Sequence, residues 1–409
     1  MRLERDHRVA ILGGGPAGAV AALTLARYGV QVTVLEKNHG PVEKLGESLP
    51  PSAQPLLHRL QLDQVLLDDE HLTSQGNRFI WGTDEVSERH FLSTTDGEGW
   101  HIDRRSFEAF LAAAARAAGV DWRWGHRFEH CKRVDGKFRL TVSWSPKAPD
   151  EPWGDGADAE RSTRVFDVDF LADASGRRAR LARRVFGIQR QRYDRLVGTA
   201  GHFVSDTPAL DTFTLVEAVP DGWWYSALLA DGRMVVAYMS DGDLLRTHSM
   251  TGQGGWGRDA FRGQLENAVA TRDRLESHGY TQVGDVRRLP AESSVLETIV
   301  GDGWIALGDA AAAYDPLSSH GIVAAMGSGY YGARSIAGQL AGLPEAREAY
   351  LSVMQGAYNT YLDLQREHYG LEQRFADRPF WGRRHRPEFC LEPLRSKGRR
   401  RTPVGDQTV

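Results

Sequence analysis

The stretch Val9-Ala10-Ile11-Leu12-Gly13-Gly14-Gly15-Pro16-Ala17-Gly18 is a short apolar run that enters a glycine-rich turn. Each of three glycines meets a separate demand. Gly13 permits the tight turn, Gly15 lets the backbone approach a pyrophosphate, and Gly18 lets the strand and a following helix, expected over residues 19–28, pack closely. The helix N-terminus adds a positive field for phosphates. The stretch therefore predicts a strand, turn and helix that hold a dinucleotide.

A second strand, expected over residues 30–35, ends at Glu36. Its position is close to the spacing of roughly 20 residues at which a carboxylate bonds a ribose hydroxyl, and it argues against a 2′-phosphate there. The order of strand, turn, helix, strand and acid favours a nucleotide site over a chance glycine pattern. Pro16 and Ala17 at the helix start and Lys37 beside the acid are assigned to the same cofactor site.

Composition narrows the class of protein. The 409 residues carry a formal net charge of −4, which gives no reason to expect nucleic acid or an anionic membrane as a partner. Cys131 and Cys390 are too few for a disulfide framework, and we expect no metal site, the cluster of His126, His130 and Cys131 included. No stretch has the length or apolarity of a membrane span, and no secretory segment precedes residue 9, so we expect a soluble, cytoplasmic enzyme.

The rest of the chain alternates between helix-like and strand-like patterns. Helices are expected over residues 53–67, 107–118 and 345–381, the second of them buried because alanine and leucine recur on every face. Strands are expected over 121–144 and 163–172, on either side of an exposed loop at 146–158, and over most of 190–290. Another buried strand, 304–307, precedes a helix of small residues that runs to 336.

Four segments, taken in order, resemble the flavoprotein monooxygenases of the para-hydroxybenzoate hydroxylase superfamily, including its flavin-dependent halogenase branch. They are the glycine turn with Glu36, the Asp103-Arg104-x-x-Phe107 segment, Asp173-Ala174-Ser175-Gly176, and Gly308-Asp309 followed by Asp315-Pro316 and Gly321-Ile322. The resemblance implies FAD as the cofactor. It places Arg104 at the polar middle of FAD, Asp309 at the ribityl chain and the backbone of residues 319–322 at the isoalloxazine. The full set of further implied cofactor residues is Ser48, Asp173, Gly176, Gly308, Pro316, Gly321 and Ile322.

The same resemblance implies an α/β (α+β) fold. We expect a Rossmann-like FAD-binding domain made of residues 1–75, 98–190 and 285–345. An inserted, mainly antiparallel β-sheet substrate domain would span 76–97 and 191–284. A C-terminal helical region with a basic tail, Arg395 to Arg401, would span 346–409.

The segments Gly46-Glu47-Ser48 and Asp315-Pro316-Leu317 point to the halogenase-related branch, but halogenase residues are missing. A halogenase needs a lysine after the first of these segments, and no lysine occurs from Leu45 to Cys131. Its companion acid is replaced by Ser318, and the Trp-x-Trp-x-Ile-Pro signature is not matched near residues 222–229. Halogenation is therefore the less favoured reading of the sequence.

A closer resemblance comes from Gly222-Trp223-Trp224-Tyr225-Ser226-Ala227, the stretch 239–241 and the aromatic tail 367–381. These segments are similar to flavoproteins that hydroxylate tryptophan in a partner polypeptide during tryptophylquinone cofactor biogenesis. The resemblance implies aromatic hydroxylation through a flavin C4a-hydroperoxide, with O2 as co-substrate and NAD(P)H or a flavin reductase as electron source. The alternatives are hydroxylation or halogenation of a free indole, phenol or pyrrole, and a non-catalytic flavin-binding maturation chaperone.

His320, Ser319 and Glu47 are the candidate catalytic residues, His320 because it precedes the helix expected at the flavin edge and because histidine as a residue type suits proton transfer near neutral pH. Turn capping by His320 and loop termination by Glu47 and Ser48 are the alternative structural roles. The aromatic residues 223–225 form either a substrate wall or core. A second glycine-rich stretch, 252–257, lacks a preceding apolar strand and is expected to be a loop rather than a second nucleotide site.

Overall fold

The computed structural model describes residues 6–67, 70–91, 97–144, 162–249 and 257–389. Its first layer is a six-stranded sheet in the order β20-β21-β12-β1-β2-β8, parallel except at β20. The strands are β1 (Arg8–Leu12), β2 (Gln31–Leu35), β8 (Asp121–Arg123), β12 (Phe170–Asp173), β20 (Val300–Gly301) and β21 (Trp304–Ala306). The predicted nucleotide-binding unit therefore forms the centre of a parallel sheet.

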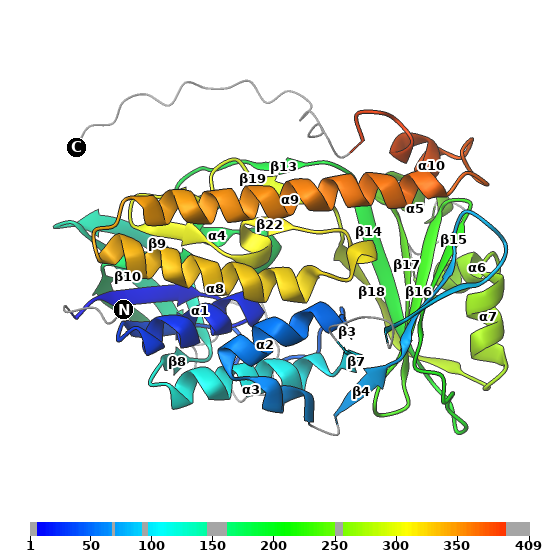
Figure 1. Cartoon of the computed structure of the whole chain (residues 1–409), viewed down its shortest axis with the longest axis horizontal. Coiled ribbons are helices and arrows are strands. Elements are labelled where there is room, and N and C mark those ends of the chain that lie inside the picture. Colours follow the sequence, from blue (N-terminus) through cyan, green and yellow to red (C-terminus); the bar gives the residue numbers. More distant parts are fainter. Residues whose placement is uncertain (1–5, 68–69, 92–96, 145–161, 250–256, 390–409) are drawn as a thin grey trace.

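Helices cover this sheet. The glycine turn leads into α1 (Pro16–Arg27), which packs against α3 (Arg104–Ala117) and α8 (Gly321–Leu340), and α8 in turn contacts α9 (Glu345–Leu371). Figure 1 shows α9 and α8 running side by side above α1. Glycine at a contact position of α8 permits this close packing, because an added Cβ on Gly329 would lie 2.3 Å from the Ala17 carbonyl oxygen.

A seven-stranded sheet forms the other half of the molecule, in the order β18-β14-β17-β16-β15-β5-β6. Its strands are β5 (Gly76–Ile80), β6 (Ser87–His90), β14 (Leu196–Val204), β15 (Thr214–Val219), β16 (Gly222–Leu228), β17 (Met234–Asp241) and β18 (Thr281–Pro290). All neighbours are antiparallel except β15 and β5. The expected boundary at residue 284 falls within β18, so this strand is shared between the two expected segments.

Helices were not expected within residues 190–290, yet three follow β17: α5 (Gly242–Ser249), α6 (Arg258–Leu265) and α7 (Val269–Glu276). Figure 1 shows α6 and α7 on the outer side of the seven-stranded sheet. Phe261 of α6 packs there against Trp224 in a second hydrophobic core. The sheet needs this cover because its outer face is apolar as well as its inner face.

Three small sheets complete the fold. One joins β9 (His126–Val134), β10 (Lys137–Trp144) and β11 (Ser162–Val168), another joins β3 (Ser48–Leu49), β7 (Gly99–Ile102) and β4 (His71–Ser74), and the third joins β13 (Arg190–Arg192), β19 (Ser294–Leu296) and β22 (Ala312–Ala313). The expected loop at 146–158, the glycine stretch 252–256 and the basic tail lie outside the described residues. The α/β (α+β) prediction with an added antiparallel sheet is confirmed.

Two helix predictions need correction. The helix expected over 53–67 is broken into η1 (Pro51–Ala53), α2 (Gln54–Leu60) and η2 (Asp63–Leu67), because Gln61 adopts a left-handed conformation with φ of 55° that ends α2. Helix α3 is buried on one side only, where Phe107, Leu111 and Ala115 face the core. Ala112 is buried as well, but Ala109 and Ala114 are half-buried and Ala113 and Ala117 are exposed, so the alanine content did not indicate burial on every face.

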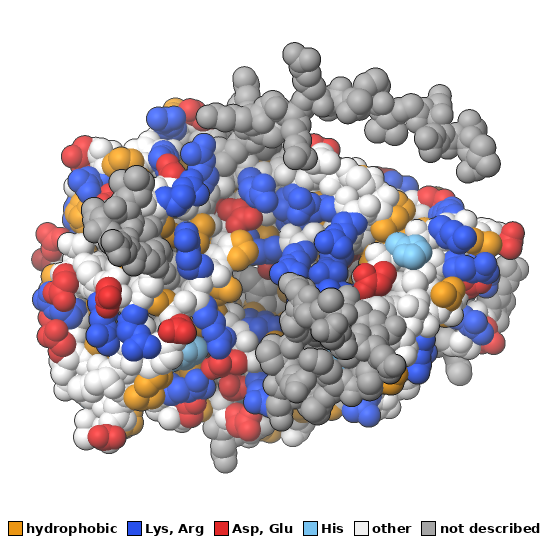
Figure 2. All heavy atoms as spheres, turned by 180° about the vertical axis from the view of Figure 1, so that it is seen from behind, with side chains coloured by type: hydrophobic (Ala, Val, Ile, Leu, Met, Phe, Trp, Pro, Cys, Tyr) orange, Lys and Arg blue, Asp and Glu red, His pale blue; other side chains and the backbone are white. Residues whose placement is uncertain are grey.

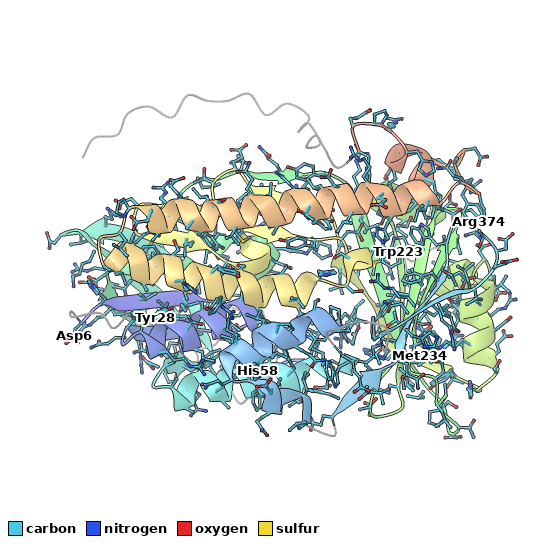
Figure 3. All side chains as sticks on the ribbon, in the orientation of Figure 1. Asp6, Tyr28, His58, Trp223, Met234 and Arg374 are labelled. Carbon is cyan, nitrogen blue, oxygen red and sulfur yellow. The ribbon has the colours of Figure 1, made fainter. Side chains whose placement is uncertain are left out.

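The C-terminal region folds back onto the seven-stranded sheet. The expected helix 345–381 is α9 followed by a break and the short α10 (Pro379–Arg384). Trp223, labelled in Figure 3 near the end of α9, donates from Nε1 to the Tyr369 hydroxyl at 3.0 Å. Trp381 donates to the Val219 carbonyl at 2.9 Å. These buried bonds tie the last helices to strands β15 and β16.

Short helices η4 (Gly176–Arg178), η5 (Gly308–Ala310), η6 (Pro316–Ser318) and α4 (Arg180–Arg184) follow the carboxyl ends of β12 and β21 or the loop after them. The carboxyl ends of neighbouring parallel strands meet at one edge of a sheet, which is where ligands bind in open α/β folds. The four resemblance segments therefore converge on one place.

Candidate active site

A cavity of about 650 Å³ lies between the carboxyl edge of the parallel sheet and the inner face of the seven-stranded sheet. Its size falls in the range of roughly 300–1,000 Å³ that is usual for ligand and cofactor sites. Its cofactor end carries most of the predicted cofactor residues. Those that line it are Gly13, Gly15, Pro16, Ala17, Glu36, Lys37, Ser48, Arg104, Gly176, Asp309, Pro316, Gly321 and Ile322.

The three glycines of the turn occupy three different environments. Gly13 has a φ of 111°, and a Cβ there would lie 2.3 Å from the Ala174 carbonyl oxygen. A Cβ on Gly18 would lie 2.0 Å from the Gly13 carbonyl oxygen, so Gly18 serves strand and helix packing and does not line the cavity. A Cβ on Gly15 would meet no atom of the described residues within 4 Å. Open space above Gly15 at the N-terminus of α1 fits a pyrophosphate.

Glu36 braces the turn. Its Oε2 accepts a hydrogen bond from the Gly14 backbone N–H at 2.8 Å, and its Oε1 accepts one from the Asn38 N–H at 2.9 Å. The side chain is 9% exposed and lines the cavity. Each carboxylate oxygen has a second lone pair, so the same group that fixes the turn is placed to bond a ribose hydroxyl.

Arg104 begins α3 and reaches across to the loop before β3. It donates from Nη1 to the carbonyl oxygens of Leu45 and Gly46, both at 3.1 Å, and from Nη2 to Glu108 at 2.6 Å. Its buried Nε has no hydrogen-bond partner among the described residues. A buried unpaired donor on the cavity wall costs free energy, and an anionic or carbonyl group of a bound cofactor would satisfy it.

The two predicted aspartates differ in environment. Asp309 lines the cavity with its side chain 37% exposed, and its Oδ2 lies 3.5 Å from Arg177 Nε. Asp173 is fully buried, accepts from the backbone N–H groups of Ser175 and Ala182, and is absent from the cavity wall. Burial raises the pKa of Asp173. The assignment of Asp173 to cofactor contact is therefore replaced by a bracing role at the start of α4.

The loop into α8 is also divided. Pro316, Ser319, Gly321 and Ile322 line the cavity, and Ser319 has a left-handed φ of 51°. His320 is exposed and absent from the cavity wall, and its ring Nδ1 contacts the Ser318 carbonyl oxygen. The expected position of His320 at the flavin edge is thus wrong, because the turn directs its ring outward. Gly308, with a φ of 55°, packs against Ala17 behind the wall.

The sequence reading missed a group of cations. Arg127, Arg178 and Arg180 line the cavity together with Lys37. Burial, and then the charges of these arginines, lower the pKa of Lys37 although Glu36 opposes the shift. These cations lie close together and repel one another, so the site favours the binding of an anionic group. The run of arginines directly after Gly176 was the available signal. Figure 2 shows Lys and Arg side chains gathered near the centre of the face seen from behind.

The sheet end of the cavity is lined by small and apolar residues. Gly198 and Ala200 of β14 and Val235, Ala237 and Met239 of β17 line it at alternate positions, as strand periodicity requires. Tyr225 of β16 pairs with Ala237 and also lines the cavity. Trp224 points to the opposite face and Trp223 is buried in the main core. Of the three aromatic residues, one is wall and two are core.

Glu47 lies at the junction of the two ends. The side chain is 4% exposed and lines the cavity. Burial raises the pKa of Glu47 to about 7, and the Arg104 charge and hydrogen bonds from the backbone at Glu47 and Gly46 only partly oppose the shift. A carboxyl with a pKa near neutrality exchanges protons at working pH, which is the property required of a general acid or base.

Replacing Glu47 with glutamine should make stability less sensitive to pH. Below pH 4.5 the carboxyl is protonated in both folded and unfolded chains, so it carries no penalty. As the pH rises towards 7 the unfolded carboxyl ionises first, and the folded state loses about 3 kcal/mol of relative stability. Urea unfolding of the FAD-free protein should show E47Q gaining about that much against wild type between pH 4.5 and pH 8.

Glu43 provides a control with the opposite sign. Burial favours a higher pKa for Glu43, but the hydrogen bond from Arg233 and the charges of His202 and Arg287 lower it overall. E43Q should therefore lose stability relative to wild type as the pH rises towards 4.5, the ordinary pKa of the carboxyl, and the difference should then stay constant up to pH 8. An unchanged difference between E47Q and wild type from pH 4.5 to pH 8 would contradict the buried, protonated state of Glu47.

The comparisons with known proteins agree with the interpretation of this cavity as an FAD site. The model of the FAD binding domain family matches residues 6–352. Putative FAD-dependent oxidoreductase LodB of Marinomonas mediterranea is 26% identical over 380 residues, 92% of this chain and 96% of LodB. The structure of CmlS, a flavin-dependent halogenase, has a TM-score of 0.79 and 25% identity over 95% of this chain and 70% of that chain. Peptidyl tryptophan dihydroxylase QhpG, essential for tryptophylquinone cofactor biogenesis, has a TM-score of 0.68 and 23% identity over 93% and 79% of the two chains.

The chain therefore belongs to the FAD binding domain family, and it is a flavin-dependent enzyme of the halogenase-related monooxygenase branch. The cavity fits the cofactor of that family. Open space at Gly15, the unpaired Arg104 Nε and the surrounding cations are what a pyrophosphate and its polar neighbours require. No helix in the described parts of the chain has the length and apolarity needed to span a membrane.

Proposed function

We propose that this enzyme hydroxylates an indole ring, that of a tryptophan side chain in a partner polypeptide, during the maturation of a tryptophylquinone cofactor. Similarity to QhpG in fold over 93% of the chain supports this substrate class. The apolar wall of Gly198, Ala200 and Ala237 also supports it, because small residues leave room for a fused ring system to lie against the sheet.

Hydroxylation is favoured over halogenation by one observation, the position of the lysines in the cavity. Among the described residues that line the cavity, the lysines are Lys37 and Lys44. Lys37 stands beside Glu36, and Lys44 is paired with Glu108 near the start of α3, so both belong to the cofactor end. Where the cofactor end meets the sheet end, the cavity offers carboxyl and hydroxyl groups instead, from Glu47, Ser48 and Tyr225. A site without a lysine there lacks the cation expected to position a hypohalous acid.

Bound FAD, when reduced, supplies the oxygen chemistry. The protein residues supply the rest. The apolar wall excludes water and orients the ring, and Glu47 holds or accepts a proton close to neutral pH. Ser319, in its left-handed turn, places backbone groups at the cavity wall. Electrons would come from NAD(P)H that binds transiently or from a separate flavin reductase.

Mass spectrometry of a tryptophan-bearing partner polypeptide tests the proposal. The polypeptide is incubated with the protein, FAD, NADH, a flavin reductase, oxygen and bromide. Addition of one or two oxygen atoms at tryptophan is expected, with no bromine. The matched control leaves out both NADH and the reductase, which removes either electron source and should leave the polypeptide unchanged.

Other outcomes point elsewhere. Bromine incorporation would restore the halogenase reading, which the CmlS-like fold favours. Modification of free indole, phenol or pyrrole with an unmodified polypeptide would make this a metabolite enzyme. Absence of NAD(P)H-dependent oxygen consumption with any of these substrates would favour a flavin-binding maturation chaperone.

A further inference from the structure

A chain of buried hydrogen-bonding groups runs from the core to the sheet end of the cavity. His101 of β7 is 1% exposed, and its two ring nitrogens lie 2.8 Å from the Leu228 carbonyl oxygen and 2.8 Å from the Thr214 hydroxyl. Thr214 Oγ1 lies 3.5 Å from Ser48 Oγ, which lies 2.9 Å from the Tyr225 hydroxyl. Tyr225 ends the chain at the cavity wall.

The donor and acceptor roles in this series of hydrogen bonds can be assigned one group at a time, beginning at His101. A carbonyl oxygen can only accept, so His101 Nδ1 must carry the hydrogen that it donates to Leu228. Burial, and then the charge of Arg274, lower the pKa of His101 to about 4, so the ring is neutral at working pH. Its Nε2 is therefore an acceptor, and the hydroxyl of Thr214 donates to it.

The same order continues outward to the cavity. The single hydroxyl proton of Thr214 is used on His101, so towards Ser48 the Thr214 oxygen can only accept. Ser48 then donates to Thr214 and accepts from the Tyr225 hydroxyl. Burial, followed by the Glu47 charge, raises the pKa of Tyr225, so the phenol keeps its proton. The lone pairs of the Tyr225 oxygen are left for the cavity.

We propose that Tyr225 is a specificity-determining residue that accepts a hydrogen bond from the ring N–H of the substrate, and that Ser48, Thr214 and His101 are positioning residues that fix it as an acceptor. This inference rests on the proposed function, because an indole carries such an N–H. The face of the substrate ring packs against the adjoining small residues of β14 and β17. The N–H at the edge of the ring donates to the Tyr225 hydroxyl oxygen. A ring of the same shape that lacks an N–H donor should bind less tightly, because it leaves the Tyr225 phenol oxygen without a hydrogen bond.

Binding to the FAD-loaded protein tests the inference. The probes are N-acetyltryptophanamide and its benzothienylalanine counterpart, which has a fused ring of the same shape but sulfur in place of N–H. Titration is followed by the visible absorbance of the bound flavin. Wild type should bind the tryptophan probe about tenfold more tightly, as expected for one buried hydrogen bond. Y225F should bind the two probes equally, while Y331F, an exposed tyrosine of α8, should behave as wild type.

A second variant separates proton order from the mere presence of a hydroxyl. T214V keeps the shape of the side chain and the Tyr225 phenol but frees the Ser48 proton, so Tyr225 can donate as well as accept. Discrimination by T214V should fall between that of wild type and Y225F.

Equal discrimination by wild type and Y225F would overturn the inference and leave the proposed function intact. Failure of the FAD-loaded wild type to bind either probe would count against the indole substrate class itself, and the inference would fall with it. Wild-type discrimination in T214V would overturn the ordered chain but leave Tyr225 as the acceptor.

Discussion

Replacing Gly15 with valine should abolish FAD binding while leaving the fold intact. The position has φ of −73° and ψ of −176°, an extended conformation that valine favours, and in the described parts of the chain a Cβ there meets nothing within 4 Å. The new side chain would occupy the space above the N-terminus of α1. Loss of two charge-assisted hydrogen bonds to a pyrophosphate, about 1.5–3 kcal/mol each, weakens binding by more than about a hundredfold. Titration of apoprotein with FAD, followed by flavin fluorescence, measures this.

Gly356 supplies the matched control. It is exposed on α9, and a Cβ there also meets none of the residues that the structure describes within 4 Å. G356V should bind FAD as wild type does. Unfolding of FAD-free G15V should match wild type within about 0.5 kcal/mol, as for a substitution that disturbs no packing. Wild-type affinity in G15V would place the pyrophosphate elsewhere, and a failure to fold would contradict the open space seen at this position.

Replacing Arg384 with methionine should cost about 3–5 kcal/mol of the free energy of unfolding, the loss expected when one partner of a buried ion pair is removed. The Arg384 side chain is 1% exposed and donates from Nη2 to Asp241 at 2.8 Å. Its guanidinium also lies 3.5 Å from the centre of the Phe380 ring. Nearby Asp241 and Tyr369 hold the pKa of Arg384 above its usual value, although burial opposes the shift. Urea unfolding measures the loss.

Arg383 is the neighbouring control. It pairs with the same Asp241 and with Asp243, but its side chain is 33% exposed, so water replaces much of what is lost. R383M should cost no more than about 1 kcal/mol. If R384M and R383M lost the same free energy of unfolding, burial would not determine how much this ion pair stabilises the fold. Because Tyr369 also donates to Asp315 on the cavity loop, R384M is expected to loosen FAD binding and R383M is not.

The cofactor half of the site was readable from sequence because its residues are close together along the chain. The glycine turn and Glu36 lie within one strand, helix and strand, and local geometry fixes their relative positions. Reasoning from neighbouring residues gave the wrong position for His320, because the direction of its ring depends on the turn at Ser319. It also gave the wrong role for Asp173, because the Asp173 carboxylate accepts a hydrogen bond from the backbone of α4. Gly308 proved to be a packing residue for a similar reason, because its neighbour Ala17 comes from another segment, whereas Gly18 packs against the Gly13 carbonyl oxygen as its place in the turn predicts.

The sequence by itself determined that this chain binds a dinucleotide cofactor on a parallel sheet and that it lacks the lysine of a halogenase, since both depend on residue identity at short spacing. Only the tertiary structure decided what surrounds the substrate. Ser48, His101, Thr214 and Tyr225 come from four strands of two sheets, and no periodicity in the sequence relates them. The raised pKa of Glu47 likewise follows from burial between those sheets and the parallel sheet, and burial is a property of the folded chain alone.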